Sequence, residues 1–236
     1  MNIYFNTHFD KILSLGSNCY PKFFISKILK PSYGETELFD YIGSSMWSIN
    51  MLILNDFKDI HNDTYFKLKP VLENDDPIVT NIKYNLRFKH DLKTVSDCNT
   101  VDFQNKLQRR IGRFKKNLKS GKVLFIRHQE SQTRRIPFSV QRSEIDELEE
   151  FIDILDIKYK CSNVKILYIN LDTDGWNERQ NIFSVKINSL HYDWAKAHKI
   201  IATLTSCTEV KYSLLKREYL SLRYNSNHAI TKVKYL

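Results

Sequence analysis

Short apolar runs alternate with amphipathic segments along most of the chain. Residues 11–16, 122–127 and 164–171 are nearly continuous apolar runs, which are typical of strands buried on both faces of a parallel sheet. Residues 182–188 form a weaker run of the same kind, and residues 77–88 alternate with period two in their second half. The pattern therefore predicts a strand in each of these five segments.

The segments between these runs carry apolar residues at helical spacing. In residues 103–118 one stripe recurs every three or four positions, through Phe103, Leu107, Ile111, Phe114 and Leu118. Such a stripe predicts an amphipathic helix with one buried face. Further helices are expected at residues 19–29, 44–54, 143–155, 193–203 and 209–223.

Residues that can cap helices lie near the expected helix ends. The expected N-caps are Ser44 or Ser45, Thr100 or Asp102, and Ser143. Ser143 and Asp146 also have the spacing of a capping box, and Gly121 stands where a glycine C-cap would end the helix of residues 103–118. Residues 57–77 are rich in Asn and Asp and predict irregular structure.

Strands that alternate with helices favour an α/β fold, in which helices pack on a mixed and largely parallel sheet. The chain of 236 residues is long enough for one large domain, and it contains neither an internal repeat nor a low-complexity linker. We therefore expect a single α/β domain over residues 1–236, with a helical C-terminal part at about 190–236.

Composition excludes several classes of protein. The chain is 42% hydrophobic and 13% aromatic, which is typical of a globular rather than a disordered protein. It has no apolar run long enough to span a membrane and no secretory signal pattern at its N-terminus, so a cytoplasmic location is expected. The lack of an export signal predicts reduced thiols, and the lack of a CxxC pair indicates neither a zinc site nor a redox dithiol. No metal and no cofactor are therefore expected. The four cysteines are Cys19, Cys98, Cys161 and Cys207.

Positive charge is concentrated in one part of the chain. The formal net charge is +9, and residues 106–142 hold twelve Lys or Arg against one acidic residue, Glu130. Such a block can contact nucleic acid or an acidic protein, with Arg109, Arg113 and Lys116 as candidate polyanion-binding residues. A solvated helix face followed by a basic loop gives the same pattern, so both interpretations stay open.

The most informative short stretch is "SLGSNC", residues 14–19, where a strand is expected to end and a helix to begin. The N–H groups and the dipole at a helix N-terminus lower the pKa of a thiol, and the thiolate is the reactive form. Gly16 permits the sharp turn, and backbone N–H groups near Ser17 and Asn18 can bind an oxyanion. Cys19 is thus a candidate nucleophile. The alternative is a small packing residue at a strand end.

Catalysis by cysteine also needs a base, and two of the seven histidines are well placed for that role. His90 and His128 each follow an expected strand directly, and strand ends in α/β proteins gather at one edge of the sheet. For either histidine, a surface or core position without chemistry is the alternative interpretation.

Five short motifs occur in the order "SLGSNC", "ETELFDYIGSSMWSI", "FKHD", "QRRIGRF" and "VLFIR". In this order they resemble a bacterial and viral family described as putative papain-like cysteine peptidases. The resemblance covers roughly residues 11–175. It implies a bacterial or viral origin, and an association with the virion is the alternative location for a viral protein.

The resemblance assigns roles to individual residues. It implies that Cys19 is the nucleophile and His90 the base, and it matches Asp91 and Asp40 to acidic residues of the family motifs. Adjacent residues of an extended strand point to opposite faces, so Asp91 can orient His90 only if the strand ends first. Asp40 comes from a separate segment and has no such restriction. Tyr41 stands where the family often has Trp.

Two functions are therefore expected as alternatives. The first is a papain-like cysteine hydrolase that cleaves a peptide, or a small amide or ester, with His128 as the alternative base. The second is a non-catalytic binding or assembly protein that contacts nucleic acid or an acidic partner through the basic helix. A nucleotide-binding loop is not favoured, because "SLGSN" has one glycine where the G-x-G-x-x-G motif has three.

Overall fold

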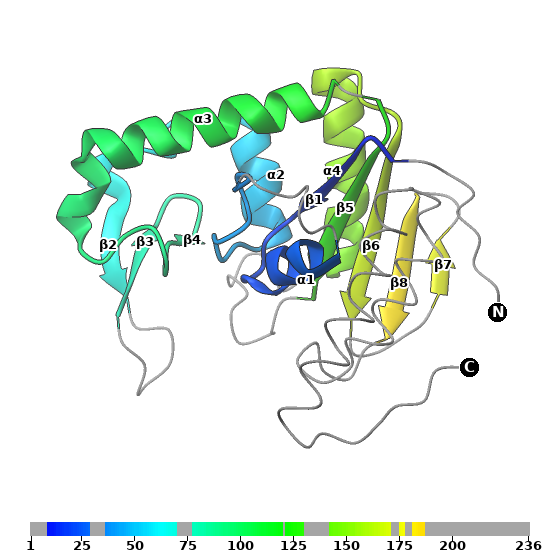
Figure 1. Cartoon of the computed structure of the whole chain (residues 1–236), viewed down its shortest axis with the longest axis horizontal. Coiled ribbons are helices and arrows are strands. Elements are labelled where there is room, and N and C mark those ends of the chain that lie inside the picture. Colours follow the sequence, from blue (N-terminus) through cyan, green and yellow to red (C-terminus); the bar gives the residue numbers. More distant parts are fainter. Residues whose placement is uncertain are drawn as a thin grey trace, which may run out of the picture.

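The computed structural model describes residues 9–28, 36–69, 77–119, 121–129, 142–170, 175–177 and 181–186. Figure 1 shows a main β-sheet with helices packed on it, and a smaller sheet near one end of a long helix. The helices expected at residues 193–203 and 209–223 lie outside the described residues, as does the whole C-terminal part from about 190.

The main sheet has five strands in the order β1-β5-β6-β8-β7. Strands β1, β5, β6 and β8 are parallel to one another, and the edge strand β7 is antiparallel to β8. Their bounds are β1 Lys11–Ser14, β5 Val123–His128, β6 Val164–Asn170, β7 Gly175–Asn177 and β8 Ile182–Lys186. The four apolar runs thus form the expected strands, and the α/β fold with a largely parallel sheet is confirmed.

Alternate residues of these strands pack on opposite faces of the sheet. Leu13 and Phe125 belong to the main hydrophobic cluster, together with residues of helices α2, α3 and α4. Ile12 and Leu124 are also buried but lie outside this cluster. Helix α1 packs against β1 and β5, and Figure 1 shows it on the other side of the sheet from α4. The helices are α1 Tyr20–Ile28, α2 Met46–Leu54, α3 Val101–Asn117 and α4 Glu144–Tyr159.

Helix α3 buries the apolar stripe that the sequence predicts. The buried residues are Phe103, Leu107, Ile111, Phe114 and Leu118. Thr100 is the N-cap and accepts a hydrogen bond from the Phe103 N–H. The expected C-cap at Gly121 is wrong, because the N–H groups of Leu118 and Lys119 already donate to carbonyls of the last turn. The helix therefore ends at Asn117.

Helices α2 and α4 also begin at the expected N-caps. Ser45 is the N-cap of α2 and accepts from the Ser48 N–H. Ser143 and Asp146 form a capping box at the start of α4. Among the described residues, no helix combines the length and the hydropathy that a membrane span requires.

The small sheet is antiparallel, in the order β2-β3-β4. A single strand over residues 77–88 is therefore wrong, because the chain reverses between β3 and β4, where Asn85 adopts φ +50°. Residues 57–77 are also less irregular than expected, since they include β2 and a 3-10 helix. The bounds are β2 Phe66–Lys69, β3 Ile78–Asn81, β4 Leu86–Arg87, η1 Asp63–Tyr65 and η2 Val95–Asn99.

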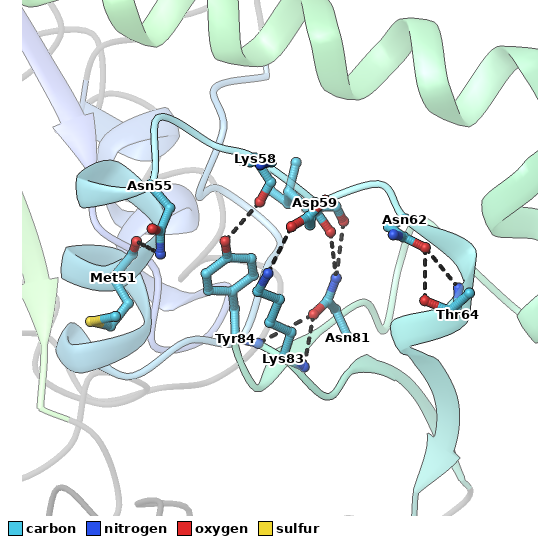
Figure 2. Close-up of polar contacts among 10 residues, drawn as sticks. Met51, Asn55, Lys58, Asp59, Asn62, Thr64, Asn81, Lys83 and Tyr84 are labelled. Carbon is cyan, nitrogen blue, oxygen red and sulfur yellow. Dashed lines mark hydrogen bonds and ion pairs between the residues drawn. The ribbon is translucent and has the colours of Figure 1, made fainter.

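Asn81 joins this reversal to the segment that follows α2 (Figure 2). Its amide oxygen accepts from the N–H groups of Lys83 and Tyr84, at 3.1 and 3.2 Å. Its amide nitrogen donates to the Ile60 carbonyl at 3.1 Å. Nearby, Lys83 pairs with Asp59 at 2.7 Å. These contacts attach the small sheet to the segment that follows α2 and form a connected polar network.

Asn81→Ala is expected to lower the free energy of unfolding by about 2 kcal/mol, because it leaves buried backbone groups without their partner. Asn81 is fully buried. Urea denaturation at neutral pH measures the loss. Asn62→Ala is the matched control, since it removes exposed bonds from the Thr64 N–H and hydroxyl and should cost only about 0.5–1 kcal/mol, at the low end for a lost cap. Equal losses in the two variants would contradict the role given to Asn81.

Candidate active site at the start of α1

The turn between β1 and α1 has an unusual backbone conformation. Gly16 has φ +69° and Ser17 has φ +72°. The Gly16 N–H donates to Ser14 Oγ at 3.1 Å, and the Leu15 N–H continues the pairing with β5. A left-handed conformation is easy for glycine but costs a serine free energy. The strand thus turns sharply into the helix over two residues, as "SLGSNC" predicts.

Cys19 lies at the N-terminus of α1 and is partly exposed. Its carbonyl accepts a hydrogen bond from the Phe23 N–H at 3.1 Å, which is the first bond of a helix. Asn18 Oδ1 accepts from the Tyr20 N–H at 2.9 Å and so satisfies one further amide of the first turn. The thiol is therefore carried at the positive end of the helix dipole.

Ser17 and Asn18, the expected oxyanion-binding positions, lie next to this thiol. Ser17 is buried, and its hydroxyl lacks a hydrogen-bond partner among the described residues. Their backbone N–H groups stay predicted oxyanion donors.

His128 lies against the residues on both sides of Cys19. The Asn18 Nδ2 and the His128 Nδ1 are 3.5 Å apart. The His128 ring packs edge-on against the Tyr20 ring, with centroids 5.8 Å apart. His128 is the last residue of β5, next to β1 in the sheet. The carboxyl ends of these two parallel strands thus bring the imidazole to the start of α1.

His90 approaches α1 by a different route. Its exposed ring packs against Tyr41, with centroids 5.3 Å apart. Tyr41 in turn packs against Phe23 of α1, at 6.3 Å. Burial raises the pKa of Tyr41, and the negative charges of Asp40 and Cys19 act in the same direction. Through these ring contacts Tyr41 lies between Phe23 of α1 and His90.

Asp40, one of the two candidate orienting acids, is completely buried. Its Oδ2 pairs with Lys22 Nζ at 2.8 Å and accepts from the Glu37 N–H at 2.7 Å. Burial raises the pKa of Asp40, although Lys22 and the Glu37 N–H act in the opposite direction. Because Lys22 belongs to α1, this ion pair connects the Tyr41 segment to the helix that Cys19 begins.

Asp91, the other candidate acid, forms a two-point ion pair with Arg110 of α3. Arg110 donates to the two carboxylate oxygens at 2.6 and 3.3 Å, and Lys106 donates at 3.2 Å. Burial alone raises the pKa of Asp91, but the hydrogen bonds and charge of Arg110, with those of Lys106, hold it below its usual value. Arg110 therefore turns inward to a carboxylate, although it belongs to the basic block.

Comparison with known proteins identifies the family of the chain. A model of the family described as putative papain-like cysteine peptidase matches residues 10–174. The chain belongs to this family. No curated protein and no solved structure matches it. The resemblance seen over residues 11–175 is thus confirmed at the level of the family.

Two other cysteines of this family member are placed unlike Cys19. Cys98 and Cys161 are free thiols that are 0% and 4% exposed. Burial raises the pKa of both. Cys207 lies outside the described residues. Among the described residues, histidine, cysteine and carboxylate side chains form no group that could hold a metal ion.

The basic block is partly neutralised in the folded protein. Arg109 and Lys116 are exposed on α3, whereas Arg113 is half-buried and donates to the Thr36 carbonyl. Several other members pair with acids outside the block, namely Lys106 and Arg110 with Asp91, Lys115 with Asp56, Arg127 with Glu144, and Arg142 with Glu150. Polyanion binding by Arg109, Arg113 and Lys116 stays a prediction.

No sequence pattern assigned a role to Tyr20, and Tyr41 and Arg127 were noted only as parts of family motifs. An arginine inside the apolar run "VLFIR" was the available signal, because a charge in a buried strand needs a partner. No local pattern marks Tyr20 or Tyr41, whose contacts come from segments distant in the chain.

Proposed function

We propose that this protein is a papain-like cysteine hydrolase in which Cys19 is the nucleophile and His128 the general base. The observation that supports the proposal is the contact of His128 with Asn18 and Tyr20, the two neighbours of Cys19 in the chain. His90, which the family resemblance favours, contacts Tyr41 and is the alternative base.

Asn18 favours one nitrogen of His128 as the base. The Asn18 Oδ1 already accepts from the Tyr20 N–H, so its Nδ2 approaches His128 Nδ1 as a donor. In the neutral ring the proton is then on Nε2, and Nδ1 carries the lone pair. The contact to Asn18 is long, 3.5 Å, and Nδ1 has only one lone pair. Nδ1 is proposed to accept the thiol proton once the Asn18 Nδ2 has given way to the Cys19 thiol.

The proposed reaction passes through a thioester. His128 Nδ1 takes the proton of Cys19 Sγ, the thiolate bonds to the substrate carbonyl carbon, and the carbonyl electron pair moves to oxygen. Backbone N–H groups near Ser17 and Asn18 stabilise that oxyanion. The oxyanion collapses and expels an amine or alcohol, which takes the proton from the imidazolium. A water that gives its proton to the imidazole then hydrolyses the thioester, and the thiol is restored.

Asp40 and Asp91, which were expected to orient His90, enter this proposal in another role. Their ion pairs with Lys22 and Arg110 support an indirect contribution, in which each carboxylate anchors a segment that carries an aromatic ring of the site. The segments are those of Tyr41 and His90.

Cys19 is expected to react with iodoacetamide at pH 7 at least about tenfold faster than Cys98 or Cys161. The latter two thiols are buried with raised pKa values, whereas Cys19 is partly exposed at a helix N-terminus. Mass spectrometry of each cysteine across about pH 5 to 9 measures the rates. A Cys19 rate that rises only near the ordinary thiol pKa of about 8.5 would contradict an activated thiol.

Matched histidine variants identify the base. His128→Gln should move the midpoint of the pH profile of Cys19 alkylation towards about 8.5, and His90→Gln should leave this midpoint unchanged. The reverse result would make His90 the base, and no shift in either variant would reject the cysteine–histidine pair. A panel of fluorogenic amides and esters, compared between the wild type and Cys19→Ser, reports hydrolysis directly.

A further inference from the structure

Arg127 is fully buried within β5, with 0% of its side chain exposed. Its guanidinium donates to the Leu15 carbonyl at 2.7 Å and to the Ser44 carbonyl at 2.9 Å. Its Nε donates to the Glu144 carboxylate at 2.7 Å, which neutralises the charge. One side chain thus joins the turn after β1, the segment before α2 and the first residue of α4.

Two of these three segments touch one another at Gly16. A Cβ on Gly16 would lie 2.7 Å from Ser44 Oγ. Leu15, whose carbonyl Arg127 holds, directly precedes the two left-handed residues Gly16 and Ser17. Contact with the Ser44 segment and hydrogen bonds from Arg127 therefore define the conformation of the turn together.

Stability alone is a weak reason for a buried arginine here. Desolvation of an Arg–Glu pair costs free energy, and apolar residues of similar volume often stabilise a fold equally well or better. The guanidinium supplies directed donors in a fixed plane, which apolar residues and lysine lack. Arg127 also precedes His128 directly, and adjacent strand residues point to opposite faces of the sheet. The same short stretch of β5 thus holds the Cys19 turn and carries the imidazole beside it.

We propose that Arg127 is a positioning residue for Cys19, a role that rests on the proposed function of that cysteine. Its hydrogen bonds to the Leu15 and Ser44 carbonyls fix the turn relative to β5. Because His128 is on β5, this also fixes Cys19 relative to His128. Arg127 acts through the turn and takes no part in the chemical steps.

Two variants separate positioning from a merely structural role. Arg127→Lys keeps a positive charge for Glu144, but its single ammonium cannot reproduce the planar fork to two carbonyls. Glu144→Gln removes the negative charge while Arg127 keeps its donors to those carbonyls. Tyr168→Phe is the matched control, because it removes only the hydroxyl that donates to Glu144 at 3.0 Å. A structural ion pair would make Glu144→Gln the more harmful change, since it leaves a buried charge uncompensated.

Cys19 alkylation and the hydrogen exchange of backbone amides are both measured under conditions in which each variant is folded. Arg127→Lys is expected to slow Cys19 alkylation at pH 7 about tenfold and to raise the midpoint of its pH profile. It should also speed hydrogen exchange of the hydrogen-bonded Leu15 and Gly16 amides about tenfold. Glu144→Gln and Tyr168→Phe should stay within about threefold of the wild type in both readouts.

The proposal is overturned if Arg127→Lys also stays within about threefold of the wild type, or if all three variants change in proportion to their loss of stability. If wild-type Cys19 reacts as an ordinary thiol, the proposed function fails, and amide exchange alone then decides the role of Arg127. If Arg127→Lys does not fold, the double variant Arg127→Met/Glu144→Leu replaces it, because apolar pairs often restore stability. The same two readouts then decide.

Discussion

Replacing Gly16 by alanine is expected to lower the free energy of unfolding by about 3 kcal/mol. The φ of +69° at this position costs an L-residue about 1–2 kcal/mol. The new methyl group would also lie 2.7 Å from Ser44 Oγ and 2.9 Å from the Ile42 carbonyl oxygen. Because one of these neighbours is backbone, the segment before α2 has to move, and such overpacking costs about another 1–3 kcal/mol.

Gly112→Ala is the matched control for this change. Gly112 lies on an exposed part of α3, and a Cβ there meets nothing within 4 Å. Alanine should therefore stabilise the helix by up to about 1 kcal/mol. Urea denaturation should therefore show a lower free energy of unfolding for Gly16→Ala and a higher one for Gly112→Ala. A loss of less than about 1 kcal/mol in Gly16→Ala would show that the turn tolerates a side chain.

Removing the Asp91 carboxylate is expected to lower the free energy of unfolding by about 3 kcal/mol at pH 7, because it leaves the charge of Arg110 buried without its main partner. Both side chains are 7% exposed and meet at 2.6 Å. Asp91→Ala is compared with Arg142→Gln, which removes a much more exposed ion pair with Glu150 and should cost no more than about 1 kcal/mol. Losses of similar size would contradict a dominant role for burial.

The contribution of Asp91 should also depend on pH. Arg110 and Lys106 hold the pKa of the folded Asp91 carboxyl below its usual value, against the effect of burial. The stabilisation is therefore fully present above the carboxyl pKa of the unfolded chain, about 3.9, and is lost as the pH falls through the lower pKa of the folded protein. The difference in the free energy of unfolding between the wild type and Asp91→Ala should become smaller below about pH 4. A difference that stays constant down to about pH 2 would contradict this assignment.

Sequence patterns predicted the elements whose signals are local. The strands at 122–127 and 164–171 are buried on both faces of the sheet, so their apolar runs are continuous. The stripe of α3 repeats over four turns, which leaves little ambiguity of period. The β3–β4 reversal was missed because its turn uses Asn81 and Asn85 in place of glycine or proline. The period-two alternation of apolar residues therefore continues through the turn without a typical turn residue to interrupt it.

The candidate site was predictable in part for the same reason. Cys19 stands out locally, because a glycine turn, a thiol and a helix start are adjacent in the chain. The choice between His90 and His128 is different, since both follow expected strands and only the order of strands in the sheet distinguishes them. The order places β5 directly beside β1. No property of the two short stretches around the histidines encodes that neighbour relation.

The pairing of β1 with β5 also bears on how the chain is made. Lys11 pairs with Val123, near the middle of the sequence, so β1 has no partner on the ribosome until β5 has emerged from the exit tunnel. Arg127 and His128 arrive on that same late strand. A nascent chain that already contains Cys19 therefore lacks His128, the proposed base, and Arg127, the proposed positioning residue. Pairing of strands over such a sequence separation is slow. Under that mechanism the thiol of the growing chain reacts as an ordinary cysteine, and it gains the reactivity of the proposed nucleophile only after β5 has been synthesised and has paired with β1.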